Sequence, residues 1–256
     1  MYTPDIVNLR HFYATFFGES VRALIADAIL RIWPTVEGDA VVGIGYATPY
    51  LSPYIDQATP LVACMPAQQG AAYWPHGGDN LVLIAHDSEL PFAESSLNRV
   101  LLVHSIENSE QLSWMIGEIW RVLTPNGKLL AVVPNRRGMW SRSSRSPFGY
   151  GRPFSITQMR DLLTEQQFTI TRTSSALFMP PIRIKFCWRI ANKLEAIGKF
   201  ICNFLGGFLG GVLLVEAEKQ IYSGIRQPVV EARNYRGTVM GGRTVMNLEK
   251  QITSID

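Results

Sequence analysis

Residues 99–134 read RVLLVHSIENSEQLSWMIGEIWRVLTPNGKLLAVVP and determine the architecture expected of the chain. The run Arg99–His104 is short and apolar, which predicts a buried strand. Apolar residues then recur at helical spacing in Ser109–Leu123, a Thr124–Gly127 turn follows, and Lys128–Pro134 predicts a second buried strand. A strand, a helix and a strand in this order form a unit whose strands run parallel.

Apolar strands alternate with helices or loops on the N-terminal side of this stretch as well. Short apolar runs predict three further strands, Ala40–Gly45, Pro60–Met65 and Asn80–Ala85. Before them, the spacing of apolar residues in 5–33 predicts two helices, and Pro34 ends that pattern. Short apolar strands separated in this way favour parallel pairing with helices on both faces.

Four further elements are expected on the C-terminal side. They are a helix over Ser155–Glu165 capped by Ser155, a strand over Phe168–Ser175, a helix over Phe186–Leu205 and a strand over 211–222. The expected fold is therefore α/β, a doubly wound, mostly parallel seven-stranded sheet with an arginine- and aromatic-rich insert after the fifth strand.

Domain organisation follows from the same pattern. One domain is expected over 1–223, with N-terminal helices in 1–35 and the α/β core in 36–223. Residues 224–256 lack strong periodicity and predict a loosely docked C-terminal tail.

Composition excludes several classes of protein. The 256 residues are 47% hydrophobic and 18% charged, so the chain is not disordered as a whole. Its three cysteines are odd in number and form no CxxC pair, which argues against a disulfide framework or zinc site and predicts a cytoplasmic location. No secretory signal is expected at the N-terminus, and the apolar run Phe200–Val215 is too short for a membrane span.

Charge is unevenly distributed along the chain. Residues 1–128 carry 6 basic and 13 acidic side chains, whereas residues 129–256 carry 18 and 8. The insert 135–154 has five arginines and no acid, with aromatic residues between them. This pattern favours a small anionic substrate or the RNA backbone, bound by candidate residues Arg136, Arg137, Trp140, Tyr150 and Arg152. In the alternative reading, the aromatics pack inward and the arginines extend into solvent.

Three segments together carry a family resemblance: Glu89–Phe92 (ELPF), Asn98–Asn108 (NRVLLVHSIEN) and Glu118–Asn135 (EIWRVLTPNGKLLAVVPN). Over about 41–167 the sequence resembles class I S-adenosylmethionine-dependent methyltransferases of the methyltransferase-11 type, which share an LPF … EIxRVLxPGGxLLxxxPN pattern. The resemblance implies the doubly wound fold and S-adenosylmethionine as cofactor.

The resemblance also implies positions for the cofactor contacts. The turn beneath the methionine half falls on 45–49, the adenine contacts fall on Asp87 and Ser88, and the end of the fourth strand falls on His104 and Ser105. The implied cofactor-binding residues are Gly43, Gly45, Tyr46, Ala47, Gln68, Asp87, Ser88 and His104.

The glycine turn departs from the family pattern and is degenerate. Gly43 stands where the first strand usually ends in an acid, and Ala47 and Pro49 replace two of the usual three glycines. The second strand is followed by no acid before Asp79, which leaves Gln68 or Gln69 to contact the ribose. Each lost charge-assisted contact is worth roughly 1.5–3 kcal/mol, or about one to two decades of affinity.

Methyl transfer needs proximity and orientation, and a general base only when the acceptor arrives protonated. His104 is the candidate base because imidazole exchanges protons near neutral pH, although a lone histidine after a strand is also a common structural residue. The motif Asn/Asp-Pro-Pro-aromatic is replaced by His-Ser-Ile-Glu at 104–107, which disfavours methylation of nucleobase amino groups. The dispersed histidines and cysteines predict no metal site.

Two functions stay open on this sequence. The first is an S-adenosylmethionine-dependent methyltransferase that acts on an anionic acceptor. The alternative is a catalytically inactive methyltransferase-like binding or scaffold protein with a protein or RNA partner. An NAD-dependent oxidoreductase is disfavoured because the sequence has no GxGxxG motif.

Overall fold

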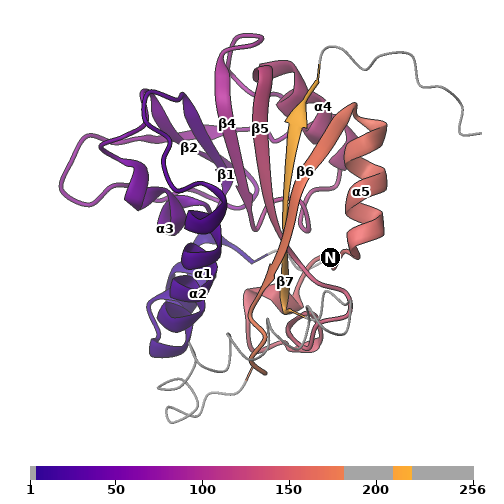
Figure 1. The fold of residues 1–256 in the computed structure, drawn as a ribbon. Coiled ribbons are helices and arrows are strands. Elements are labelled where there is room, and N and C mark those ends of the chain that lie inside the picture. The colour runs from indigo at the N-terminus through magenta and orange to yellow at the C-terminus, as the bar shows by residue number, and fades with distance from the viewer. Residues whose placement is uncertain (1–3, 182–209, 221–256) are drawn as a thin grey trace, which may run out of the picture. The chain divides into compact units, whose positions relative to one another are not determined.

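The protein is built around one seven-stranded sheet with the strand order β3-β2-β1-β4-β5-β7-β6 (Figure 1). The computed structural model describes residues 4–181 and 210–220, all within one compact unit, Met1–Ser223. Strands β3, β2, β1, β4 and β5 pair in parallel, and β7 runs antiparallel between β5 and β6. The doubly wound, mostly parallel sheet expected from the sequence is confirmed. The strands are β1 (Val41–Gly45), β2 (Leu61–Pro66), β3 (Val82–Ala85), β4 (Leu97–Val103), β5 (Leu123–Pro134), β6 (Phe168–Ala176) and β7 (Val212–Lys219).

Helices cover both faces of the sheet. They are α1 (Ile6–Tyr13), α2 (Phe16–Ile32), α3 (Thr48–Leu51), α4 (Leu112–Val122) and α5 (Ile156–Glu165). Side chains alternate along each strand, so successive residues enter different cores. In β4, Leu101 and Val103 pack in the core with α1 and α2, while Val100 and Leu102 pack in the core with α4 and α5.

The helix starts follow local sequence signals. Asp5 caps α1, Thr15 caps α2, and Ser155 caps α5 as predicted, each by accepting a hydrogen bond from a backbone N–H in the first turn. At α5 the Gln158 side chain also accepts from the backbone N–H of Ser155, which completes a capping box.

One expected feature differs from the structure, and two others lie outside the residues it describes. The predicted turn at Thr124–Gly127 lies inside β5, which begins at Leu123 because that residue pairs with Leu97 of β4. Asn126 still adopts a left-handed φ of 62°, so the local turn preference survives as an irregularity in the strand. The predicted helix 186–205 and tail 224–256 lie outside the described residues.

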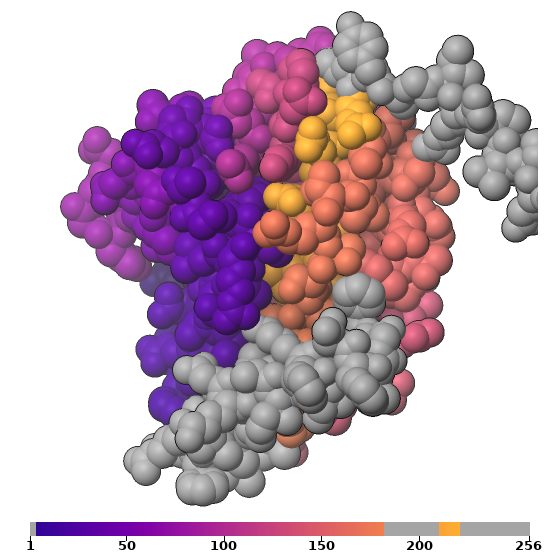
Figure 2. Space-filling model, in the orientation of Figure 1, coloured from indigo at the N-terminus to yellow at the C-terminus, as the bar shows by residue number. Residues whose placement is uncertain are grey.

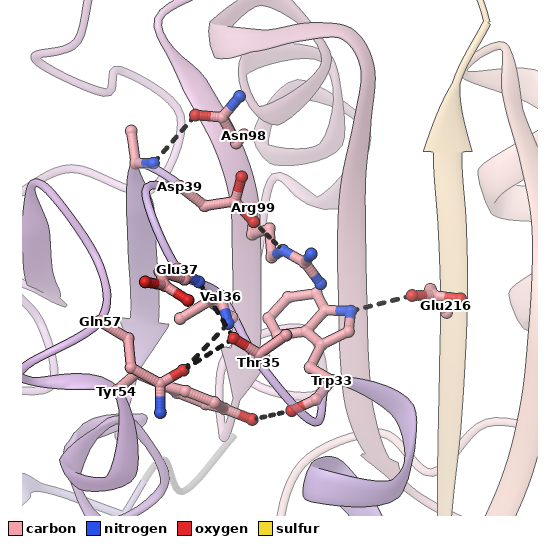
Figure 3. A network of polar contacts seen from close by, with 11 residues as sticks. Trp33, Thr35, Val36, Glu37, Asp39, Tyr54, Gln57, Asn98, Arg99 and Glu216 are labelled. Carbon is pink, nitrogen blue, oxygen red and sulfur yellow. Dashed lines mark hydrogen bonds and ion pairs between the residues drawn. The ribbon is translucent and has the colours of Figure 1, made fainter.

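Trp33, directly after α2, fixes the N-terminal helices to the antiparallel side of the sheet (Figure 3). Its fully buried indole donates from Nε1 to Oε1 of Glu216 on β7, at 2.9 Å. Thr171 of β6 donates to the other oxygen of that carboxylate at 2.8 Å. On the neighbouring surface, α2 lies against β6 (Figure 2), where the Arg172 guanidinium donates to Arg31 O.

We expect Trp33→Phe to lower the free energy of unfolding by about 1–3 kcal/mol, because it leaves Oε1 of the buried Glu216 carboxylate without its donor. Urea unfolding followed by circular dichroism measures the change. Trp114→Phe is the matched control, since Trp114 is 72% exposed. Equal stability of the two variants would contradict an anchoring role for the indole N–H.

Neither a membrane span nor a metal cluster is found in the described part of the chain. Within 4–181 and 210–220, no helix is long and apolar enough to cross a membrane. No group of three histidine, cysteine or acidic side chains lies close enough together in these residues to hold a metal ion. Cys64 is buried in β2, and burial raises the pKa of its thiol to about 11, so it is no nucleophile near neutral pH.

Candidate functional site

The candidate site lies at the carboxyl ends of β1 and β4, where the strand order reverses and doubly wound sheets bind their ligands. Gly45 ends β1 with φ +83°, and a Cβ there would stand 2.3 Å from Val103 O. The glycine therefore lets the turn after β1 close tightly over the end of β4.

Gly43, two residues before Gly45 in β1, packs against α3. A Cβ at this position would stand 2.6 Å from both Ala47 Cβ and Leu51 Cδ1. The space that an acidic side chain would need at the end of the first strand is thus filled by the helix that follows. Ala47 is itself completely buried in this packing.

A buried hydrogen-bonded chain, Tyr13–His104–Glu107, occupies the centre of the site. Tyr13 comes from α1, and its hydroxyl lies 2.8 Å from His104 Nε2. On the other side of the ring, Nδ1 lies 3.1 Å from Glu107 Oε1. All three residues are at most 5% exposed, and His104 adopts a left-handed φ of 52°. A hydroxyl group, an imidazole and a carboxylate that can orient the imidazole are therefore linked by successive hydrogen bonds.

The hydrogen positions in the Tyr13–His104–Glu107 hydrogen-bonded chain follow from the two outer residues. A carboxylate can only accept, so Nδ1 of His104 carries the hydrogen and Nε2 accepts from the Tyr13 hydroxyl. Burial, and after it the neighbouring Tyr50, raises the pKa of the Tyr13 phenol well above its usual value. The phenol therefore stays protonated and serves as the donor.

Aromatic rings pack around Tyr13 and His104 and leave little space beside them. Tyr46 stacks on Tyr13 at 5.4 Å between ring centroids, and Tyr50 donates to the Tyr13 hydroxyl at 3.0 Å. From the insert, Phe148 packs 4.7 Å from the His104 ring. The position above the glycine turn, where the resemblance places the methionine half of the cofactor, is therefore filled by α1 and by the insert.

A small cavity of about 20 Å³ remains beside His104. It is lined by Pro66, Gln68, Gln69, Asp87, His104, Ser105, Asn108 and Ser109. Asp87 accepts a hydrogen bond from the Ser109 hydroxyl at 2.7 Å, and Ser88 contacts His86 Nδ1 at 2.7 Å. The structure thus brings the predicted residues Gln68, Asp87 and His104 together, while the nearby Ser88 does not line this cavity.

The cavity is rich in hydrogen-bond acceptors. Gln69 and Asn108 both donate to His104 O, at 3.1 Å each. The oxygens of the same two amides, Gln69 Oε1 and Asn108 Oδ1, are buried without a donor from the described residues. Unpartnered acceptors of this kind suit a ligand that brings donors.

S-adenosylmethionine fits this site only in part. The carboxylate of Asp87 and the free oxygens of Gln69 and Asn108 suit the amino and hydroxyl donors of the adenosine half. A volume of about 20 Å³, however, holds one water molecule rather than a nucleoside. The methionine half does not fit while Tyr13 lies on His104. The polar residues therefore match the nucleoside chemically. To make room for the whole cofactor, Tyr13 has to be displaced from His104.

The insert packs its aromatic residues inward and exposes its arginines. Trp140, Phe148 and Phe154 are buried and Tyr150 is half-buried, whereas Arg136, Arg137, Arg142, Arg145 and Arg152 are exposed. The expectation that Trp140 contacts substrate disagrees with its burial, because an indole with no exposed surface has no face left for a ligand. Substrate binding by the exposed arginines and by Tyr150 stays a prediction.

Three residues that contact the His104 ring, Tyr13, Glu107 and Phe148, were not predicted from the sequence. Glu107 carries a local signal, since an acid three residues after a candidate base can orient it. Tyr13 and Phe148 carry none, because they reach His104 from segments that are distant along the chain.

Comparison with known proteins agrees with the fold. Residues 39–131 match the methyltransferase domain family model. The structure is similar to an S-adenosylmethionine-dependent methyltransferase from Thermotoga maritima (TM-score 0.58, 14% identity, 84% of this chain and 96% of that one). It is also similar to a Haloferax volcanii methyltransferase in complex with the Trm112 activator (TM-score 0.56, 17% identity, 84% of this chain and 95% of that one).

An S-adenosylmethionine-dependent methyltransferase from Mesorhizobium loti is also similar (TM-score 0.51, 12% identity, 75% of this chain and 96% of that one). At such identities the structural likeness concerns the fold, and no curated protein matches the sequence. The sequence match and the structural likeness together show that the chain has the Rossmann-like fold of S-adenosylmethionine-dependent methyltransferases and that residues 39–131 are similar to the methyltransferase domain family.

Proposed function

We propose that the chain is an S-adenosylmethionine-dependent methyltransferase that acts on a protonated oxygen or nitrogen of an anionic acceptor. The observation that carries the proposal is the buried His104–Glu107 pair, whose free ring nitrogen already binds a hydroxyl group. When bound, the cofactor supplies an electrophilic methyl group. The chain would supply the base and hold the acceptor in line.

His104 is suited to take the acceptor's proton. Glu107 holds the hydrogen on Nδ1 and so keeps the lone pair of Nε2 directed at the site. The Tyr13 hydroxyl, 2.8 Å from Nε2, lies where an acceptor hydroxyl would lie once α1 has moved. Asp87 and Gln69 would hold the nucleoside from the adjacent cavity.

A binding or scaffold protein without catalysis is the second candidate. Two packing features favour it: the aromatic rings around Tyr13, and α3 against Gly43. Both occupy space that the cofactor would need in the conformation described. The Haloferax relative is a methyltransferase in complex with an activator protein, which supports a protein partner for this chain too. The cytoplasmic location stays a prediction from cysteine usage.

Calorimetric titration with S-adenosylhomocysteine separates the two candidates. We expect micromolar binding, reduced at least tenfold in Asp87→Asn, because a carboxylate that accepts from the adenine amino group is worth about 1.5–3 kcal/mol. Asp79→Asn is the matched control, since Asp79 is exposed and does not line the cavity.

The titration has two other outcomes. Absence of heat and of thermal stabilisation at millimolar ligand would favour the scaffold protein. Tight binding that is unaffected in Asp87→Asn would place the adenine elsewhere.

A further inference from the structure

A cleft of about 250 Å³ lies between α1 and the insert. It is open to solvent and is lined by Pro4, Asn8, His11, Phe12, Thr15, Ser144, Arg145, Ser146, Pro147 and Tyr150. We propose that this cleft binds the oxyanion, a phosphate or carboxylate, of a small molecule. The inference rests on the proposed function in one respect, since it takes that molecule to be the methyl acceptor.

Ser146 is the first observation that points to a ligand. The residue is 2% exposed, yet its hydroxyl has no hydrogen-bond partner among the described residues. A buried hydroxyl left unpaired costs about 1–3 kcal/mol, so a partner at this position is strongly favoured. Because Ser146 lines the cleft, a ligand oxygen there can accept its hydrogen.

The charge of the cleft selects an anion. Arg145 lines it from the insert and His11 from α1, and both side chains are exposed. None of the described residues that line it is acidic. The nearest acid in sequence, Asp5, accepts a hydrogen bond from the Asn8 backbone N–H as the cap of α1. A guanidinium beside hydroxyl donors matches the oxygens of a phosphate or carboxylate.

The wall formed by the insert is held in shape before any ligand arrives. Trp140 and Phe148 anchor it in the core on both sides of Ser146. At Gly149 the backbone packs so closely on Ser143 that a Cβ would stand 2.0 Å from Ser143 O. A preformed wall reduces the ordering cost of binding.

The cleft is adjacent to the candidate base. Phe12 and Pro147 line the cleft, and the residue following each of them, Tyr13 and Phe148, contacts His104. An acceptor anchored in the cleft by its oxyanion would therefore lie one layer of side chains from Nε2. About 250 Å³ accommodates a small metabolite, whereas a nucleic-acid strand needs an extended groove.

Titration of the full-length protein with inorganic phosphate at constant ionic strength tests the proposal, with malonate as the carboxylate probe. We expect saturable binding of one equivalent, weakened at least tenfold in Arg145→Gln and about threefold or more in Ser146→Ala. Arg142→Gln, in the same insert but outside the cleft, should bind within about twofold of the unmodified protein. Whichever probe binds more tightly identifies the preferred oxyanion.

Three results would overturn the proposal. They are no binding at 10 mM of either probe, equal weakening in the Arg142 and Arg145 variants, and tighter binding of a single-stranded RNA with equal loss in both variants. Thermal melting of each variant confirms that it is folded. Phosphate binding without S-adenosylhomocysteine binding would keep the oxyanion site and reject the proposed function, so the two can fail separately.

Discussion

Replacing Trp140 with alanine is expected to lower the free energy of unfolding by about 3–5 kcal/mol, a large fraction of the stability of a domain of this size. The indole is fully buried and stacks on Phe17 of α2, with 5.5 Å between ring centroids and 17° between ring planes. Its Nε1 donates to Met179 O at 2.6 Å. The substitution leaves a large cavity and an unpaired carbonyl oxygen, and both destabilise the fold.

Chemical denaturation and limited proteolysis measure this effect. Because Trp140 joins the insert to α2, the variant should also be cleaved faster within 135–154. Trp114→Ala removes the same ring from an exposed site and should change the stability by less than about 0.5 kcal/mol. Equal losses in the two variants would refute the packing role of Trp140.

Tyr13→Ala is expected to strengthen binding of S-adenosylhomocysteine by at least tenfold. In the unmodified protein the ligand must displace the Tyr13 ring from Tyr46 and its hydroxyl from His104, and this cost lowers the apparent affinity. Alanine removes both contacts and opens space beside the acceptor-lined cavity. Calorimetry of the two proteins under the same conditions measures the ratio of the dissociation constants.

Tyr13→Phe separates the ring from its hydroxyl. The phenylalanine ring still fills the space, so this variant should gain far less affinity than Tyr13→Ala. If Tyr13 is only a core residue, the alanine variant will melt at a lower temperature and bind the ligand no more tightly than the unmodified protein. That outcome would support the scaffold candidate.

Much of the fold could be predicted because its signals are local. The apolar runs of β1 and β4, the helical spacing in α4 and the Ser155 cap each depend on a few adjacent residues. The start of β5 could not be read in this way. Its pairing of Leu123 with Leu97 is a tertiary contact that extends the strand through a turn-forming sequence.

The candidate site was predicted in part for a similar reason. Asp87 and His104 meet because each follows a parallel strand, and parallel strands end at one edge of the sheet. Tyr13 lies 91 residues from His104, and no pattern in α1 indicates which strand end its phenol will cover. The insert also shows why aromatic residues mislead, since composition alone does not separate a half-buried ring such as Tyr150 from a fully buried core residue such as Trp140.

The packing of α3 on Gly43 has a consequence for redesign of this turn. An acid at position 43 would drive its side chain into Ala47 and Leu51, so the single substitution is disfavoured whatever a ligand gains from it. Room for the acid requires smaller side chains at 47 and 51 as well. The three positions form one coupled packing unit, and their substitutions are expected to be non-additive.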